Sequence, residues 1–149
     1  MNSTAPRAFL PEMSELPTVA PAADPTPPRS AAACVELDAR ALAELSQLDP
    51  GGAGRLVHRV LVTYQGSLAR LVQQLTAAMT TGDLATVRLS VHTLKSSSAS
   101  VGALALSDMC AQAELAVRQE RTVELPALIE RLLTEAEQVR LAVQRKLSD

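Results

Sequence analysis

The feature that most constrains the fold of this chain is a long apolar stripe with helical spacing between residues 53 and 80. Residues three and four apart share one face of an α-helix, so this spacing predicts a long amphipathic helix that buries one side. Gly66 in its middle is a tolerated weak point that costs about 1 kcal/mol relative to alanine. The stripe consists of Leu56, Val57, Val60, Leu61, Tyr64, Leu68, Leu71, Val72, Leu75 and Met79.

Shorter stripes of the same kind predict further helices over residues 36–48, 84–100, 104–117 and 123–147. Asp38 and Asp83 stand where N-caps are expected, and Pro126 is tolerated only in the first turn of the last helix. The expected core positions in these helices are Leu37, Ala41, Leu42, Leu45, Leu84, Val87, Val91, Leu94, Val101, Leu104, Leu106, Met109, Cys110, Ala113, Leu115, Ala116, Val117, Leu125, Leu128, Ile129, Leu132, Leu133, Ala136, Val139, Leu141 and Val143.

The connections between these helices are short, which favours antiparallel neighbours. Apolar residues make up 47% of the sequence, mostly Ala, Leu and Val, with one Phe, one Tyr and no Trp. That composition suits closely packed helices and is poor for a β-sandwich. We therefore predict an all-α protein, an up-down antiparallel four-helix bundle with a short leading helix, formed by residues 34–149 as one domain.

Residues 1–33 carry seven of the nine prolines and show no apolar periodicity. Proline lacks the backbone donor that a helix needs and pushes the preceding residue toward extended conformations. We therefore predict a disordered proline-rich tail or linker. A proline-rich docking peptide is the alternative for this segment.

Several classes of function are disfavoured by what the sequence lacks. A net charge of −2 gives no basic surface for nucleic acid, and no stretch approaches the roughly 20 apolar residues that span a bilayer. We expect a cytoplasmic monomer without a signal peptide or membrane insertion. Cys34 and Cys110 are too few for a disulfide framework or a metal site. No nucleotide-binding or serine-hydrolase motif is present, so we expect no cofactor, no ATP binding and no autonomous kinase activity.

One histidine stands apart, within the segment VHTLKSSSASVG at residues 91–102. Steps of about 100° per residue place His92 roughly 130° from the middle of the apolar stripe, toward solvent or a partner. Lys95 follows one turn later on the same face, where its charge can compensate a bound phosphate. Nucleophilic acceptance of a group is the chemistry left open to such an imidazole. The alternative is an ordinary surface histidine, which is our interpretation of His58.

The neighbours of His92 predict an accessible surface. Arg88, one turn earlier, adds a second positive charge, although a solvated arginine is the commoner explanation. Ser96 and Ala99 on the same side are small and leave the imidazole unshielded. Leu89 points away from the apolar stripe and is a candidate docking side chain, because it leaves an apolar group exposed one turn from the histidine.

The order of a histidine, a lysine at plus three and a glycine at plus ten in residues 91–103 resembles the signature of histidine phosphotransfer (HPt) domains. The resemblance extends from about Val35 to Leu147. It implies that His92 is the phosphorylated residue, that Lys95 steadies the phosphoryl group, and that Gly102 allows tight packing beside the site. The family often has glycine directly after the lysine, where this chain has Ser96, whose hydroxyl can alter access or bond to the phosphoryl group.

The resemblance also implies the partners. His92 would accept a phosphoryl group from a receiver-domain aspartate and relay it to another receiver domain. The partners would be the receiver domains of response regulators and hybrid sensor histidine kinases. The receiver would bring the Mg²⁺ and most of the catalytic groups. Arg88, Leu89, Ser96 and Ala99 would contribute to receiver docking.

The alternatives to a phosphorelay carrier are a helical adaptor that binds a receiver or kinase domain without phosphotransfer, and the C-terminal HPt part of a hybrid sensor kinase. The phosphoacceptor region of a histidine kinase is disfavoured, because such regions usually follow their histidine with an acidic residue and this chain has Thr93 there.

Overall fold

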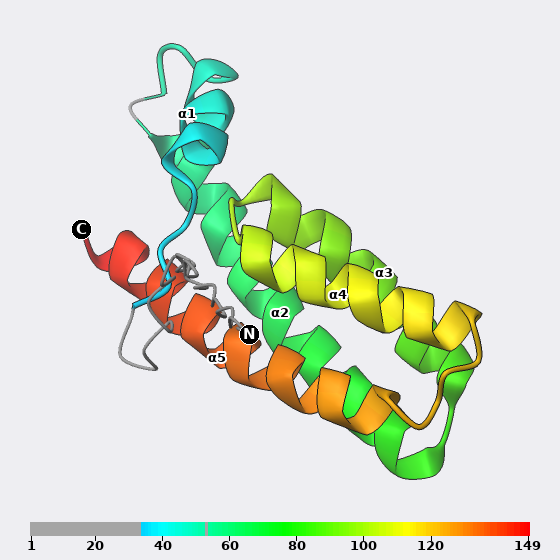
Figure 1. Cartoon of the computed structure of the whole chain (residues 1–149). Coiled ribbons are helices and arrows are strands. Elements are labelled where there is room, and N and C mark those ends of the chain that lie inside the picture. Colours follow the sequence, from blue (N-terminus) through cyan, green and yellow to red (C-terminus); the bar gives the residue numbers. More distant parts are fainter. Residues whose placement is uncertain (1–33, 53) are drawn as a thin grey trace, which may run out of the picture. The chain divides into compact units, whose positions relative to one another are not determined.

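The structure is a computed structural model that describes residues 34–52 and 54–149. Residues 1–33, for which we predict a disordered tail, lie outside the described residues. The described part contains five helices and no strand, which confirms the all-α prediction. They are α1 (Ala39–Gln47), α2 (Arg55–Thr81), α3 (Leu84–Ser100), α4 (Leu104–Arg118) and α5 (Leu125–Ser148) (Figure 1).

The helices begin at the signals that the sequence places there. The Asp38 carboxylate accepts a hydrogen bond from the backbone N–H of Ala41 at 3.2 Å, and so caps α1. Asp83 caps α3, because Oδ1 accepts the Thr86 backbone N–H at 3.1 Å and Oδ2 accepts the Thr86 hydroxyl at 2.6 Å. These hydrogen bonds to Thr86 hold the pKa of Asp83 below its usual value. Pro126 lies in the first turn of α5, as predicted, where its missing N–H costs no helical hydrogen bond.

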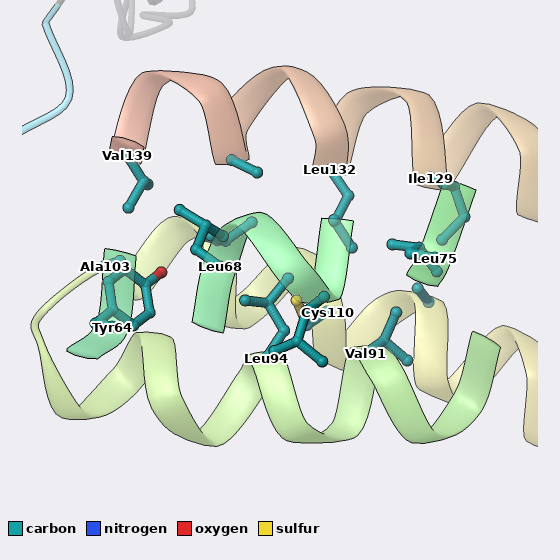
Figure 2. Packing of buried hydrophobic residues seen from close by; sticks show 14 of the residues in the cluster. Tyr64, Leu68, Leu75, Val91, Leu94, Ala103, Cys110, Ile129, Leu132 and Val139 are labelled. Atoms are coloured by element: carbon teal, nitrogen blue, oxygen red, sulfur yellow. The ribbon is translucent and has the colours of Figure 1, made fainter. Parts of the chain in front are cut away.

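The four long helices share one apolar core. Helix α2 packs against α3 and α5, helix α4 also packs against α3 and α5, and the short α1 packs against α2. Figure 2 shows side chains of the long helices converging, with Leu75 from α2, Val91 from α3, Cys110 from α4 and Leu132 from α5. The buried core consists of Leu42, Leu61, Tyr64, Leu68, Leu71, Leu75, Ala78, Val87, Val91, Leu94, Val101, Ala103, Leu106, Cys110, Ala113, Ala116, Leu125, Ile129, Leu132, Ala136, Val139 and Val143.

Three residues expected in the core are exposed instead. Leu84 and Leu104 have exposed fractions of 38% and 49%, because each is the first residue of its helix and lies at the edge of the packed region. Leu115 is 42% exposed, while Ala113, Glu114 and Ala116 on either side of it are buried. Leu115 therefore lies outside the buried face of α4.

A buried hydrogen bond joins α2 to α3. The hydroxyl groups of Tyr64 and Ser98 lie 2.9 Å apart, and both residues are buried. Burial raises the pKa of Tyr64 to about 12, because the phenolate would lose its hydration. The pair satisfies two polar groups that would otherwise be unpaired in the core.

Candidate functional site

His92 lies on the outer face of α3. Its neighbours Val91 and Leu94 are fully buried, whereas 57% of the imidazole side chain is exposed. The helical period produces this contrast, because His92 follows a core position by one residue and is therefore rotated about 100° away from it. The expected orientation of His92 away from the core is confirmed.

A carboxylate on α4 contacts the exposed imidazole. Nδ1 of His92 lies 2.9 Å from Oε1 of Glu114. The second carboxylate oxygen, Oε2, accepts a hydrogen bond from the Lys95 ammonium at 2.6 Å. Glu114 therefore bridges the two residues that the sequence placed on one face of α3. Only 11% of its side chain is exposed, compared with 34% for Lys95.

The charges of Lys95, Glu114 and His92 determine which of their atoms carry protons. The hydrogen bond from Lys95, followed by the one from His92, holds the pKa of Glu114 below its usual value, against the opposing effect of burial. Glu114 is therefore ionised at neutral pH and accepts hydrogen bonds only. The proton of a neutral His92 is accordingly assigned to Nδ1, which leaves the lone pair on Nε2. A nucleophilic nitrogen therefore points away from Glu114.

A hollow of about 370 Å³ opens beside the imidazole. Ala85, Arg88, Leu89, His92 and Glu114 line it. Leu89 is 66% exposed, so an apolar side chain is available one turn from the histidine. Two of the four residues proposed from the sequence for docking thus lie together with His92.

The other two docking candidates lie further along α3. Ser96 and Ala99 are exposed, but neither lines the hollow. The Ser96 hydroxyl lies 3.5 Å from the backbone carbonyl of His92, which is a long and weak hydrogen bond within the helix. Both residues leave the surface beyond the imidazole free of bulky groups.

Gly102 makes its close contact with the segment that leads into α1. It follows the end of α3, ten residues beyond His92. Its φ of +84° is in the left-handed region, and an added Cβ would meet the Asp38 backbone N at 2.6 Å and O at 2.9 Å. Its carbonyl accepts the Asp38 N–H at 2.9 Å. The tight packing therefore exists, but with the residue that caps α1.

Sequence reasoning missed Glu114. Its position in the expected helix over residues 104–117 carried a signal, because Cys110, Ala113, Glu114 and Val117 follow the spacing of one buried face. A carboxylate at such a position needs a cationic or hydrogen-bonding partner. The neighbouring helix supplies only Arg88 and Lys95 as cations, so a link to the His92 face was inferable.

The described residues give little support to metal binding or to cysteine chemistry. Across 34–52 and 54–149, no group of three His, Cys, Asp or Glu residues is placed to hold a metal ion. Burial raises the pKa of the Cys110 thiol to about 12, so this cysteine is a core residue rather than a nucleophile. None of the helices described here is both long enough and apolar enough to cross a bilayer.

Comparison with known proteins defines the class. The model of the Hpt domain family matches residues 59–142, which is more than half of the 149 residues and includes His92, Lys95, Gly102 and Glu114. The chain belongs to the Hpt domain family. It is similar to the crystal structure of histidine-containing phosphotransfer protein B (HptB) from Pseudomonas aeruginosa PAO1, at 27% sequence identity and a TM-score of 0.68. That match covers 78% of this chain and 97% of HptB. No curated protein matches the chain.

Proposed function

We propose that this protein is a phosphorelay carrier that accepts a phosphoryl group on His92 from a receiver-domain aspartate and passes it to another receiver. The observation that carries the proposal is the exposed imidazole whose Nδ1 lies 2.9 Å from Glu114. This contact assigns the lone pair to Nε2. The membership of the Hpt family and the likeness to HptB support the same function.

The transfer step follows from this arrangement. The Nε2 lone pair attacks the phosphorus of an aspartyl phosphate, an N–P bond forms, and the P–O bond to the aspartate breaks, so the aspartate leaves as a carboxylate. The proton stays on Nδ1, where Glu114 accepts its hydrogen bond and stabilises the positive charge that develops on the ring. Lys95 lies on the same face and supplies a positive charge for the phosphoryl oxygens. The reverse attack by a second receiver's aspartate returns the neutral imidazole.

The receiver domain supplies the Mg²⁺ in this proposal. Both oxygens of Glu114, the carboxylate lining the hollow, already accept hydrogen bonds from His92 and Lys95. The residues around His92 are thus suited to receiving the phosphoryl group rather than to binding a cation. Arg88, Leu89, Ser96 and Ala99 form the receiver-docking surface, with Arg88 and Leu89 lining the hollow beside His92.

The proposal also includes the helical topology, the oligomeric state and the cellular location. Short connections between α2, α3, α4 and α5, together with their packing, support the up-down antiparallel four-helix bundle. A monomer is expected, because the apolar stripes are covered within the chain. A cytoplasmic location is part of the same proposal.

The test is transfer from a phosphorylated receiver domain to the wild type, to His92→Gln and to His58→Gln. The chain contains two histidines, and His58 is also exposed, so His58→Gln is a matched control. Acid-labile, base-stable label is expected on the wild type and on His58→Gln, and not on His92→Gln. Label on His92→Gln would move the site elsewhere. Binding without label, across several receivers, would favour an adaptor without phosphotransfer.

A further inference from the structure

The side-chain hydrogen bonds between α3 and α4 converge on two residues. In the part of the chain that the structure describes, three such bonds join these helices, which pack side by side (Figure 1). Two of them join Glu114 to His92 and to Lys95. In the third, the Ser107 hydroxyl donates to the backbone carbonyl of Lys95 at 2.9 Å. All three bonds therefore end on His92 or Lys95.

The Ser107 hydroxyl differs in its partner from other helical hydroxyl groups of this chain. Those of Ser46, Thr76 and Ser100 each donate to the carbonyl four residues earlier in the same helix. The equivalent acceptor for Ser107 is the carbonyl of Ala103, but its hydroxyl bonds to the neighbouring helix instead. The bond from Ser107 is thus a link between two helices rather than a local contact.

This link constrains the position of α4 along α3 more tightly than its neighbours do. Buried side chains such as Leu94 and Cys110 hold the two helices together, but apolar burial is non-directional, whereas a hydrogen bond is short and directional. Lys95 and Glu114 have long side chains with several rotatable bonds, so their ion pair can follow a shifted helix. Serine carries its hydroxyl on Cβ and its acceptor is a backbone atom, so the Ser107 bond joins one backbone closely to the other.

We infer that Ser107 is a positioning residue for phosphotransfer, because its hydroxyl fixes the register of α4 against α3 and thereby holds Glu114 at Nδ1 of His92. The inference rests on the proposed function of His92. Ser107 and Glu114 are seven residues apart on α4, which is nearly two helical turns, so both lie on the side of α4 that faces this part of α3.

Loss of this register would act on the chemistry through the imidazole tautomer. Moving α4 by one residue along α3 would displace Glu114 by about 1.5 Å, which is enough to disrupt its 2.9 Å contact with Nδ1. A neutral imidazole without that contact shares its proton between both nitrogens, and only the fraction with a free Nε2 lone pair can attack. Misplacements of about 1 Å can slow a reaction about a hundredfold.

The first test measures the tautomer of His92 and needs no phosphate. The chain contains two histidines, so ¹⁵N-histidine labelling of the full chain gives imidazole signals for His92 and, as the internal control, for His58. At about pH 8.5, where imidazole groups are ordinarily neutral, the wild type should carry the His92 proton on Nδ1. Ser107→Ala should shift the His92 signals toward a mixture of tautomers, and Ser107→Thr, which keeps the hydroxyl, should restore them. The His58 signals should not change.

The second test measures transfer to His92 in single turnovers. At saturating phosphorylated receiver, Ser107→Ala should slow labelling about tenfold or more, while the half-saturating receiver concentration changes less than about twofold, because the docking surface is intact. In a Glu114→Gln background Ser107→Ala should have no further effect, since the hydroxyl acts through Glu114. The matched control is Ser46→Ala, which removes a hydroxyl bonded within α1 and should match the wild type.

Two results would overturn the inference. Unchanged His92 signals in Ser107→Ala would show that Glu114 keeps its place without the hydroxyl. A slowing that is equally large in the Glu114→Gln background would show that Ser107 acts by another route. Alanine is a strong helix former, so the helical circular dichroism should be retained. Ser107→Cys, which keeps the size of the side chain with only a weak donor, provides a second variant with the same expected shift.

The two tests also separate this inference from the function on which it rests. If neither a phosphorylated receiver nor phosphoramidate places phosphate on His92 of the wild type, the proposed function fails. The imidazole signals of the unphosphorylated proteins still decide in that case whether the Ser107 hydroxyl holds Glu114 at Nδ1.

Discussion

The Lys95 ammonium and the Glu114 carboxylate, which lie 2.6 Å apart, form a contact between α3 and α4 at the edge of the core. The carboxylate is buried and the ammonium is half-buried, so the pair connects the interior of the bundle to the surface that carries His92. Its effect on stability and its effect on phosphotransfer can be measured separately.

The stability of the protein should depend on pH through Glu114. Because the pKa of Glu114 is lowered in the folded protein, its contribution to the free energy of unfolding is present above the unfolded-state pKa, near the ordinary value of 4.5, and is lost as the pH falls through the folded-state pKa. Urea unfolding of the wild type and of Glu114→Gln should therefore show a wild-type advantage at pH 7 that shrinks as the pH falls below about 4.5.

Asp83 and Glu137 also have lowered pKa values, so the absolute stability of either protein falls in acid for several reasons. The difference between the two proteins removes those shared contributions. A wild-type advantage that stays constant from pH 7 to pH 3 would show that the Glu114 carboxylate is not stabilised by its hydrogen bonds.

Substituting Gly102 by alanine should destabilise the fold. The left-handed φ of +84° alone costs a non-glycine residue about 1–2 kcal/mol. The new Cβ would also stand 2.6 Å from the Asp38 backbone nitrogen, so the chain before α1 must shift. We expect Gly102→Ala to lower the free energy of unfolding by about 2 kcal/mol or more in urea titrations.

Gly66→Ala is the matched control for this substitution. Gly66 lies inside α2 with nothing within 4 Å of an added Cβ, so alanine there should stabilise the protein by about 0.5–1 kcal/mol. A Gly102→Ala variant as stable as the wild type would contradict the close approach of Asp38.

Leu89 should matter for transfer and not for folding. With 66% of the residue exposed, Leu89→Ala is expected to change the free energy of unfolding by less than about 0.5 kcal/mol. If the receiver buries this side chain, transfer from a phosphorylated receiver at limiting protein concentration should slow about tenfold, equivalent to about 1.4 kcal/mol of lost contact.

Leu48→Ala tests whether the loss of any exposed leucine has the same effect. Leu48 is 74% exposed at the end of α1 and contributes nothing to the hollow beside His92. Equal transfer rates for Leu89→Ala and the wild type would remove Leu89 from the docking surface.

The single tyrosine provides an optical test of the core. Since burial raises the pKa of Tyr64 to about 12, the folded protein should show almost no phenolate absorbance at pH 10.5. In denaturant the same tyrosine should titrate near its ordinary value of 10. A folded protein, checked by circular dichroism, whose tyrosine ionises near pH 10 would place Tyr64 in contact with water.

Most of the helical structure could be predicted from local signals. Apolar spacing located the helices, and the caps at Asp38 and Asp83 and the position of Pro126 defined their beginnings, because each of these signals acts within one turn. The exposure of Leu115 could not be predicted in this way. Burial of a residue at the edge of an apolar stripe depends on how closely the neighbouring helices approach. The hydrophobicity of the residues does not determine that distance.

The site was predictable only in part for a related reason. His92, Lys95, Arg88 and Leu89 belong to one helix, so their common face follows from the helical period. Glu114 is 22 residues from His92, and its contact with the imidazole depends on the relative position of α3 and α4. For Gly102 the family resemblance implied tight packing beside the site, but its contact with Asp38 could not be foreseen, because Asp38 lies far away in the sequence.

The contact between Gly102 and Asp38 has a practical consequence for anyone who excises this domain. The family match begins at residue 59, yet the backbone of Asp38 seals the turn between α3 and α4, and Leu42 of α1 belongs to the core. A fragment cut at the family boundary would lose both and open a hole at the turn that leads from the His92 helix to the Glu114 helix. Fusion proteins and crystallisation fragments should therefore start at or before Cys34.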